Sequence, residues 1–176
     1  MPDYSLNIHE DEAIKGNPKA KHTLIEFGDY ECPYSRMGYR FVQRILKDHE
    51  EKLRFVFRHF PISKKHPHAE ICAEAALFAG QEGVFWEMHD LLFDHNLSLN
   101  REKLDEFADQ IGLDIYQFRM ALENRTFKSR VQQDYRSGVK HGVNDTPTFF
   151  MNQMKYEGKL EMNTLRAFIE QQLSER

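Results

Sequence analysis

Apolar positions near the start of the chain follow first the pattern of a buried strand and then that of an amphipathic helix. Residues 22–27 and 53–60 are rich in β-branched and aromatic side chains, which predicts two central strands. Between them, residues 33–47 repeat apolar side chains at helical spacing behind a proline, which suits the first position of a helix. This order predicts a parallel pair of strands joined by a crossover helix.

A helical tract follows, and the strand pattern returns after Gly142. Apolar stripes predict three helices, around residues 69–80, 84–92 and 104–111. Asp114 and Thr126 are each expected to cap a further helix. The helices are short and apolar on one side, so we expect them to pack together as a small bundle.

The ends of the chain complete the predicted α/β organisation. Residues 148–151 and 154–156 predict a hairpin, followed by a last helix with apolar positions from 165 to 173. The polar residues 1–21 are expected to form an arm or a short edge strand. The predicted order of elements is therefore a strand–helix–strand unit, a helical insertion, and then two strands and a helix.

Composition and charge narrow the classes of function. The formal charge of −4 comes from 24 basic and 28 acidic residues without a run of one sign, so neither nucleic acid nor a membrane surface is an expected partner. The N-terminal stretch lacks the apolar core of a signal peptide, and no later stretch is long enough to span a bilayer. We therefore expect a cytoplasmic protein in which Cys32 and Cys72 are reduced thiols and not a structural disulfide.

Cys32 stands at the turn between the first strand and its helix, directly before Pro33. At the helix N-cap its sulfur would face the free N–H groups of Tyr34 and Ser35, and these donors and the helix dipole favour a thiolate over a thiol. We expect an exposed, reactive thiolate here; the alternative is a buried, inert small side chain. Glu26 is an acid inside an apolar strand, which is costly unless it is paired or protonated. It is either a proton-handling group near the sulfur or a structural acid.

Four stretches of the chain resemble the DsbA-like branch of the thioredoxin superfamily. They are Cys32-Pro33-Tyr34 after a strand, Glu26 six residues ahead of it, residues 85–90 (Phe-Trp-Glu-Met-His-Asp), and Thr146-Pro147-Thr148-Phe149 before the hairpin. The resemblance covers most of the chain from about residue 22 onward. It implies a thioredoxin-like fold with an inserted α-helical domain, with residues 1–61 and 127–176 in the thioredoxin-like domain and residues 62–126 in the insertion.

The resemblance also implies an activity and a site. Members of the family exchange thiols and disulfides, and Cys32 would be the nucleophile, with Glu26 assisting proton transfer. A cis peptide bond between Thr146 and Pro147 would lie beside the cysteine. Protein or peptide disulfides would be the substrates, held by a surface that comprises Pro33, Tyr34, Thr146 and Pro147.

Ser35 departs from the family pattern, which has a second, resolving cysteine at this position. A serine hydroxyl cannot displace a sulfur, so Cys32 could enter a mixed disulfide but could not leave it through an internal bond. One interpretation is a monothiol enzyme, in which Ser35 donates a hydrogen bond to the Cys32 thiolate and glutathione, as co-substrate, resolves the intermediate. The other is a lost activity.

Two further classes of function stay open at this point. The chain could be a non-catalytic peptide-binding or holdase-like module that keeps the groove without the chemistry. It could also be a kappa-type glutathione transferase or isomerase, which has a similar architecture but usually relies on an active-site serine.

The remaining cysteine and the histidines predict no second site. Cys72 lies on a small-residue stripe, so core packing is its expected role, although it could instead resolve Cys32. His66, His68 and Cys72 are close in sequence, but no second ligand pair completes a tetrahedral metal set. We expect no metal and no bound cofactor.

Overall fold

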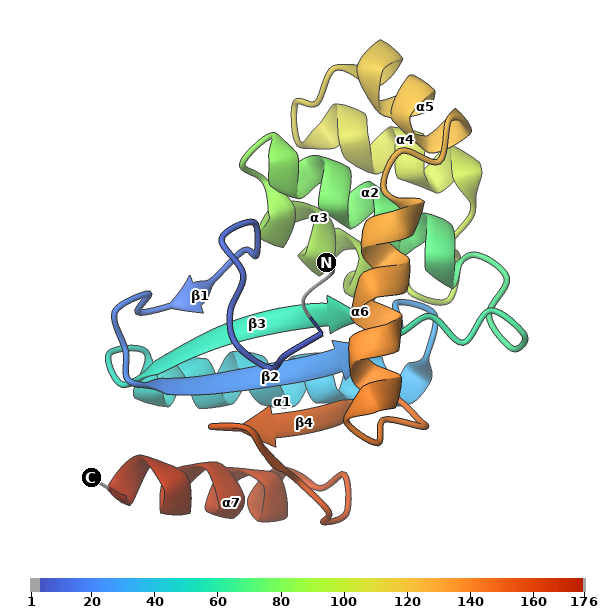
Figure 1. The fold of residues 1–176 in the computed structure, drawn as a ribbon. Coiled ribbons are helices and arrows are strands. Elements are labelled where there is room, and N and C mark those ends of the chain that lie inside the picture. The colour runs from blue at the N-terminus through green and yellow to red at the C-terminus, as the bar shows by residue number, and fades with distance from the viewer. Residues whose placement is uncertain (1–3, 176) are drawn as a thin grey trace.

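The computed structural model describes residues 4–175 and contains one mixed sheet (Figure 1). The strands are arranged in the order β1-β3-β2-β4-β5, with β1 at Lys15–Gly16, β2 at His22–Gly28, β3 at Leu53–His59, β4 at Thr148–Met151 and β5 at Met154–Lys155. The short β1 pairs antiparallel with β3, so the polar N-terminal stretch supplies the expected edge strand.

The predicted crossover unit is confirmed. β2 and β3 are parallel, with Leu24 opposite Phe55 and Gly28 opposite His59. The helix α1, Pro33–His49, joins them and starts at the predicted proline. On the other side of β2, β4 runs antiparallel and continues into β5, as the hairpin pattern predicted.

Five helices separate β3 from β4, and a sixth closes the chain. They are α2 at Ala69–Gln81, α3 at Phe85–Asp94, α4 at Arg101–Gln110, α5 at Ile115–Glu123, α6 at Lys128–Lys140 and, after the hairpin, α7 at Met162–Ser174. In Figure 1, α2 to α5 gather beyond one end of the sheet, and α6 returns across it. The domain boundaries at residues 61 and 127 stay a prediction, since α6 contacts both α2 and β3.

The two predicted caps have different outcomes. The Asp114 carboxylate accepts the N–H of Gln117 at 2.9 Å, which confirms it as the cap of α5. The prediction for Thr126 is wrong, because α6 begins at Lys128 and no side chain caps it. The Thr126 N–H instead bonds the carbonyl of Ala121 and completes the end of α5.

Two cores lie on opposite faces of the sheet. The helix face packs against α1 and α7, through residues such as Leu24, Phe55, Ile45 and Leu165. The arm face packs against the N-terminal arm, residues 4–14, through residues such as Ile25, Phe27, Val56 and Leu6. Side chains alternate along each strand, so Thr23, Ile25 and Phe27 turn to the arm face and Leu24 and Glu26 to the helix face.

The mixed sheet and the helices packed against it confirm the predicted α/β class. Within residues 4–175, every helix is too short or too polar to cross a membrane.

Candidate active site

The turn between β2 and α1 places Cys32 at the start of the helix. Cys32 is the N-cap residue with extended backbone angles, and Pro33 follows as the first helical residue. Its N–H donates to the carbonyl of Asp29 at 3.1 Å, and its carbonyl accepts the N–H of Arg36 at 3.1 Å. The backbone of the cysteine is therefore fixed on both sides.

The expectation of an exposed sulfur at the cap was wrong. Cys32 is only 4% exposed, and its thiol does not bond the helix N–H groups. The Sγ instead donates to the carbonyl of Thr146 at 3.5 Å. The segment before β4 lies over the cysteine, so an incoming disulfide has to displace this contact to reach the sulfur.

The loop before β4 brings the other resemblance residues to the cysteine. The Thr146–Pro147 peptide bond is cis. Thr146 is buried, and its N–H donates to the side chain of Asp145 at 2.9 Å. Cys32, Thr146 and Pro147 thus form one contiguous site, and the exposed Pro33 and Tyr34 lie next to it on α1.

Glu26 lies on the helix face, below this site. It is 1% exposed, and its Oε1 has no hydrogen-bond partner among the described residues. A side-chain carbon added at Gly38 of α1 would meet both Glu26 Oε1 at 3.3 Å and the Pro147 ring at 3.1 Å, so the carboxyl group lies close to the cis-proline. Burial raises the pKa of Glu26 well above its usual range. The group can therefore hold a proton at neutral pH.

Ser35 occupies the position where the family has its second cysteine. It is fully buried, and its Oγ accepts the N–H of Asp29 at 3.1 Å. Within the described part of the chain, no hydrogen bond joins Ser35 to Cys32. The expected Ser35–Cys32 bond is therefore not formed here, but the hydroxyl proton stays available because the oxygen is used only as an acceptor.

Two acidic residues of the turn hold the loop between β3 and α2, a feature that the sequence interpretation missed. The buried carboxylate of Asp29 accepts the N–H of Ile62 and the Nδ1–H of His66, both at 2.8 Å. Glu31 accepts the N–H of His68 at 2.7 Å and lies 3.0 Å from its Nδ1. Two acids spaced by one residue and two histidines with the same spacing were the signal in the sequence.

Tyr30, which lies between Asp29 and Glu31 in the sequence, connects the cysteine turn to the inserted helices. Its hydroxyl lies 2.9 Å from Nδ1 of His89, and both side chains are buried. Burial lowers the pKa of His89 well below its usual range, so the imidazole is neutral. His89 belongs to the Phe-Trp-Glu-Met-His-Asp stretch, so this contact joins that stretch to the cysteine turn.

Cys72 lies in the helix-face core and is completely buried. Burial is the main reason that its thiol pKa is raised well above the usual value, with Glu31 and Asp29 adding to the shift. Both cysteines are free thiols. Among residues 4–175, no three His, Cys, Asp or Glu side chains come together in a way that could hold a metal ion.

The family model described as Thioredoxin matches residues 9–171, almost the whole chain. The chain belongs to this family. Its fold also matches oxidised BdbD from Bacillus subtilis, with a TM-score of 0.83, 23% identity and coverage of 93% of this chain and 94% of that chain. A DsbA protein of Wolbachia pipientis, α-DsbA1, matches with a TM-score of 0.81 and 19% identity over 96% of this chain and 93% of that chain. The DsbA-like resemblance is thereby confirmed for the fold.

A thioredoxin-like oxidoreductase from Silicibacter pomeroyi is more similar in sequence, at 28% identity, with a TM-score of 0.80 and coverage of 93% and 92% of the two chains. Among curated proteins, the chain is 37% identical to the Na(+)/H(+) antiporter NhaA 1 of Salinispora arenicola over 156 residues, which is 89% of this chain and 24% of that protein. The NhaA antiporter of Herminiimonas arsenicoxydans is 34% identical over 161 residues, 92% of this chain and 25% of that protein. The chain therefore spans about a quarter of the length of these curated relatives.

Proposed function

We propose that this protein is a thiol–disulfide oxidoreductase that acts through one nucleophile, Cys32. The observation that carries the proposal is the joint position of Cys32 at the start of α1, the Thr146–Pro147 segment against its sulfur, and Ser35 where a second cysteine would stand. The similarity to the oxidoreductase of Silicibacter pomeroyi supports the reaction class. The Thioredoxin family match over residues 9–171 supports it further.

In the first step, the Cys32 thiolate attacks the glutathione sulfur of a mixed disulfide between glutathione and a protein or peptide, so that the protein or peptide thiolate leaves. The substrate S–S bond breaks, a new S–S bond forms with Cys32, and the leaving thiolate takes up a proton. Glu26 can donate this proton, because burial raises the pKa of its carboxyl group well above the usual range, and it regains a proton from the Cys32 thiol when the thiolate forms.

In the second step, glutathione attacks the disulfide that now includes Cys32. This attack releases Cys32 as a thiolate and forms glutathione disulfide. Atoms and electrons balance, because the sulfur of the substrate protein or peptide is reduced to a thiol while the sulfur of the incoming glutathione is oxidised to a disulfide. Ser35 cannot perform this step, but its unused hydroxyl proton can be donated to the Cys32 thiolate once the thiol no longer bonds Thr146.

The substrate surface follows from the same geometry. An extended peptide next to the Thr146–Pro147 segment would replace the bond between the Cys32 thiol and the Thr146 carbonyl. Pro33 and Tyr34 give it an exposed flank on α1, where Tyr34 is 62% exposed. We further propose a reducing compartment such as the cytoplasm, where glutathione is the abundant small thiol and Cys32 stays reduced.

The test is the reduction of a glutathionylated peptide by glutathione, with the release of free peptide thiol as the readout. The wild type and Cys72→Ala are expected to turn over, because Cys72 lies in the core away from solvent. Cys32→Ser is expected to show no turnover above the uncatalysed rate. Activity that survives in Cys32→Ser, or is lost in a folded Cys72→Ala, would contradict the proposal.

One observation favours a second candidate, a non-catalytic peptide-binding module. Cys32 is only 4% exposed and its thiol is already hydrogen-bonded, as in a sulfur that only packs. The module predicts that Cys32→Ala leaves partner binding unchanged and that the glutathionylated peptide is bound without turnover. The same assay therefore separates the two candidates.

A further inference from the structure

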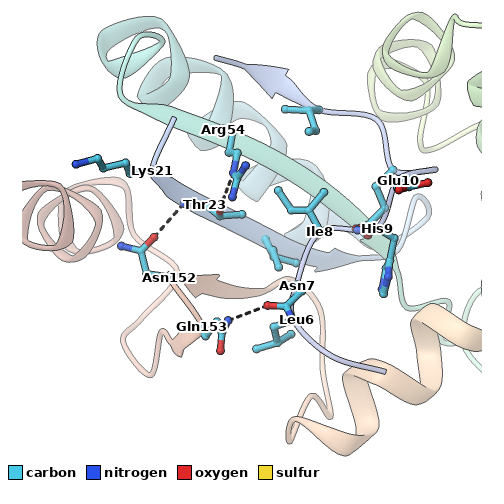
Figure 2. Close-up of a pocket in the computed structure, with 13 residues that line it drawn as sticks. Leu6, Asn7, Ile8, His9, Glu10, Lys21, Thr23, Arg54, Asn152 and Gln153 are labelled. Atoms are coloured by element: carbon cyan, nitrogen blue, oxygen red, sulfur yellow. Dashed lines mark hydrogen bonds between the residues drawn. The ribbon is translucent and has the colours of Figure 1, made fainter. Parts of the chain in front are cut away.

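A cavity of about 660 Å³ lies between the N-terminal arm and the arm face of the sheet (Figure 2). Its volume falls within the usual range of small-molecule sites, roughly 300 to 1,000 Å³. None of the residues assigned to the Cys32 site lines it. The cavity is therefore a separate feature of the fold that thiol–disulfide exchange does not use.

Part of the cavity lining is apolar. Ile25 of β2 belongs to the arm-face core, and the arm supplies Leu6, Ile8 and Ile14. Figure 2 places Leu6 and Ile8 of the arm over the sheet, with Asn152 and Gln153 of the β4–β5 turn at one side. A ligand with an apolar body would bury that body against the isoleucines.

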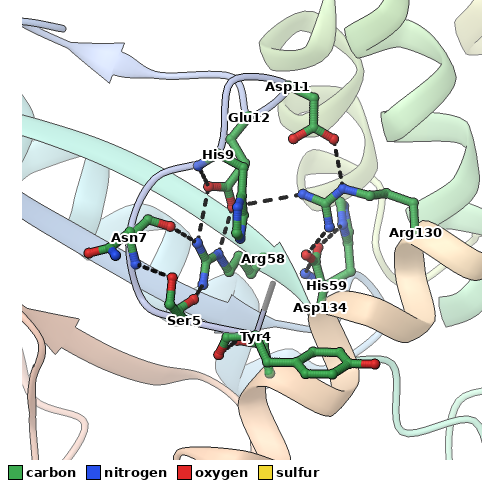
Figure 3. Close-up of polar contacts among 11 residues, drawn as sticks. Tyr4, Ser5, Asn7, His9, Asp11, Glu12, Arg58, His59, Arg130 and Asp134 are labelled. Atoms are coloured by element: carbon green, nitrogen blue, oxygen red, sulfur yellow. Dashed lines mark hydrogen bonds and ion pairs between the residues drawn. The ribbon is translucent and has the colours of Figure 1, made fainter. Parts of the chain in front are cut away.

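The arm that roofs the cavity is held in place by a buried ion pair (Figure 3). Arg58, 1% exposed, donates to the carboxylate of Glu12 at 2.6 and 3.1 Å and to the carbonyls of Ser5 and Asn7 at 2.7 and 2.6 Å. Asp11 is bonded to Arg130 of α6 at 2.8 Å. Because these contacts anchor the arm on both sides of residue 8, the cavity is a preformed part of the structure.

A second arginine on the same sheet face has no such partner. Arg54 lies four residues before Arg58 on β3, so both side chains turn to the arm face. Arg54 donates from Nε to Thr23 Oγ1 at 2.8 Å and from Nη1 to the Pro18 carbonyl at 3.4 Å. Among residues 4–175, neither Arg54 nor Lys21 forms an ion pair, although both line the cavity.

The charges are also separated along the cavity. Figure 2 shows Arg54, Thr23 and Lys21 together at one end, and Glu10 at the other end. Arg58 is neutralised by Glu12, so the uncompensated positive charge belongs to the Arg54 end. A guanidinium that uses only two of its N–H groups can still bind a carboxylate through others.

We propose that this cavity binds a small monocarboxylate with an apolar body. The carboxylate pairs with Arg54, with Lys21 at the mouth, and the apolar body packs against Ile8, Ile14 and Ile25. This binding is independent of the chemistry at Cys32.

The experiment uses the full chain and two fluorescent probes that differ in charge. Anilinonaphthalene sulfonate is apolar and anionic, and phenylnaphthylamine is a similar apolar amine without the anionic group. The wild type is expected to bind the anionic probe saturably, and decanoate is expected to displace it, whereas decanol is not. In the double variant Arg54→Gln/Lys21→Gln, affinity for the anionic probe is expected to fall about tenfold or more, with about twofold or less change for the neutral probe.

The matched control is Lys47→Gln/Lys52→Gln. It removes the same charge at two exposed lysines that do not line the cavity, and it should leave both affinities unchanged. A second variant, Ile8→Trp, fills the cavity and should weaken both probes without a change of charge. Ile8→Trp also provides an independent test of the cavity in case the loss of Arg54 unfolds the edge of the sheet.

Three results would overturn the proposal. The first is that the anionic probe binds a folded Arg54→Gln/Lys21→Gln as tightly as the wild type. The second is that decanol and decanoate displace the probe equally well. The third is that alkylation of Cys32 abolishes probe binding. The last would place the probe at the Cys32 site, which the cavity does not include.

Discussion

The two faces of the sheet each bury a carboxyl group, and they do so in opposite ways. On the helix face, Glu26 has an Oε1 without a hydrogen-bond partner among residues 4–175, and burial raises its pKa well above the usual range, which favours the neutral, protonated form. On the arm face, Glu12, whose side chain is 4% exposed, is neutralised by Arg58. A buried charge is costly in either place, and protonation and pairing are the two ways to remove that cost.

The two carboxyl groups differ in what they can do: Glu26 can take part in a reaction, whereas Glu12 can only stabilise the structure. A carboxyl group that holds an exchangeable proton near Cys32 can take part in thiol chemistry, because its protonation state can change during a reaction. A carboxylate that is bonded to an arginine, which also donates to two backbone carbonyls of the same arm, has a fixed charge and a fixed geometry. In the proposed function the helix face supplies the proton-handling group, whereas the arm face fixes the N-terminal arm.

The largest effect is expected on the arm face. Arg58→Met removes the closest cationic partner of the buried Glu12 carboxylate. The carboxylate is left with the His9 N–H at 2.8 Å and the more distant Arg130 at 3.9 Å, so the free energy of unfolding should fall by about 3 kcal/mol. Urea denaturation at neutral pH measures it. Arg54→Met is the matched control, since Arg54 pairs with no carboxylate among residues 4–175, and it should cost about 1 kcal/mol or less. Equal losses in the two variants would show that the Glu12–Arg58 pair is not what holds the arm.

A smaller and pH-dependent effect is expected at Glu26. Because its folded pKa is raised, its contribution to stability is complete below the ordinary carboxyl range and is lost as the pH rises through the raised value. Glu26→Gln has no such proton, so the difference in unfolding free energy between wild type and variant should shift in favour of the variant as the pH increases. Urea titrations from about pH 4 to 8 measure this difference. Parallel pH profiles would mean that Glu26 is ionised in the folded protein.

Tyr30→Phe tests the link between the cysteine turn and the inserted helices. The change removes the hydroxyl beside His89 Nδ1 and leaves that buried nitrogen without a partner, at an expected cost of about 1 to 2 kcal/mol. Thermal or urea unfolding reports the loss. Tyr39→Phe removes a partly buried hydroxyl that donates to Asp90 at 3.1 Å, and it should cost less. The reverse order would weaken the assignment of Tyr30 as the main anchor.

The smallest effect is expected for Gly38→Ala. The new carbon would lie 3.1 Å from Phe149 and Pro147 and 3.3 Å from Glu26 Oε1, which costs packing energy. The better helix propensity of alanine offsets about 1 kcal/mol of it, so the net loss should be about 1 kcal/mol or less. The pH dependence of Cys32 alkylation should nevertheless change, since the carbon presses on Glu26. An unchanged profile would separate Glu26 from the reactivity of the sulfur.

The elements that the sequence predicted correctly are those that depend on local pattern. β2, α1, β3 and the hairpin follow from the spacing of apolar residues, and Glu26 stood out because it breaks that pattern. The burial of Cys32 was missed because its partner, Thr146, is 114 residues away in the sequence. The partner of Ser35 was missed because the Asp29 N–H is turned toward it only by the shape of the turn.

The acid–histidine contacts beside the cysteine could not be derived from spacing alone. Asp29 and His66 are 37 residues apart, and so are Glu31 and His68, and only the folded turn brings each pair within hydrogen-bond distance. The prediction for Thr126 failed for a local reason, because α6 begins only at Lys128, which makes Phe127 and not Thr126 its N-cap residue. Short-range patterns locate the elements, and the contacts between distant loops decide which polar groups meet.

The central claim is that Cys32 is a single nucleophile whose mixed disulfide is resolved by a thiol of another molecule. The most direct test is to treat the wild type and Ser35→Cys with glutathione disulfide and to measure the intact masses. The account predicts one glutathione adduct on Cys32 of the wild type, stable until a thiol is added. In Ser35→Cys the adduct should give way to an internal disulfide between residues 32 and 35, with release of glutathione. A wild type that forms no adduct on Cys32, or that loses its adduct without added thiol, would contradict the claim.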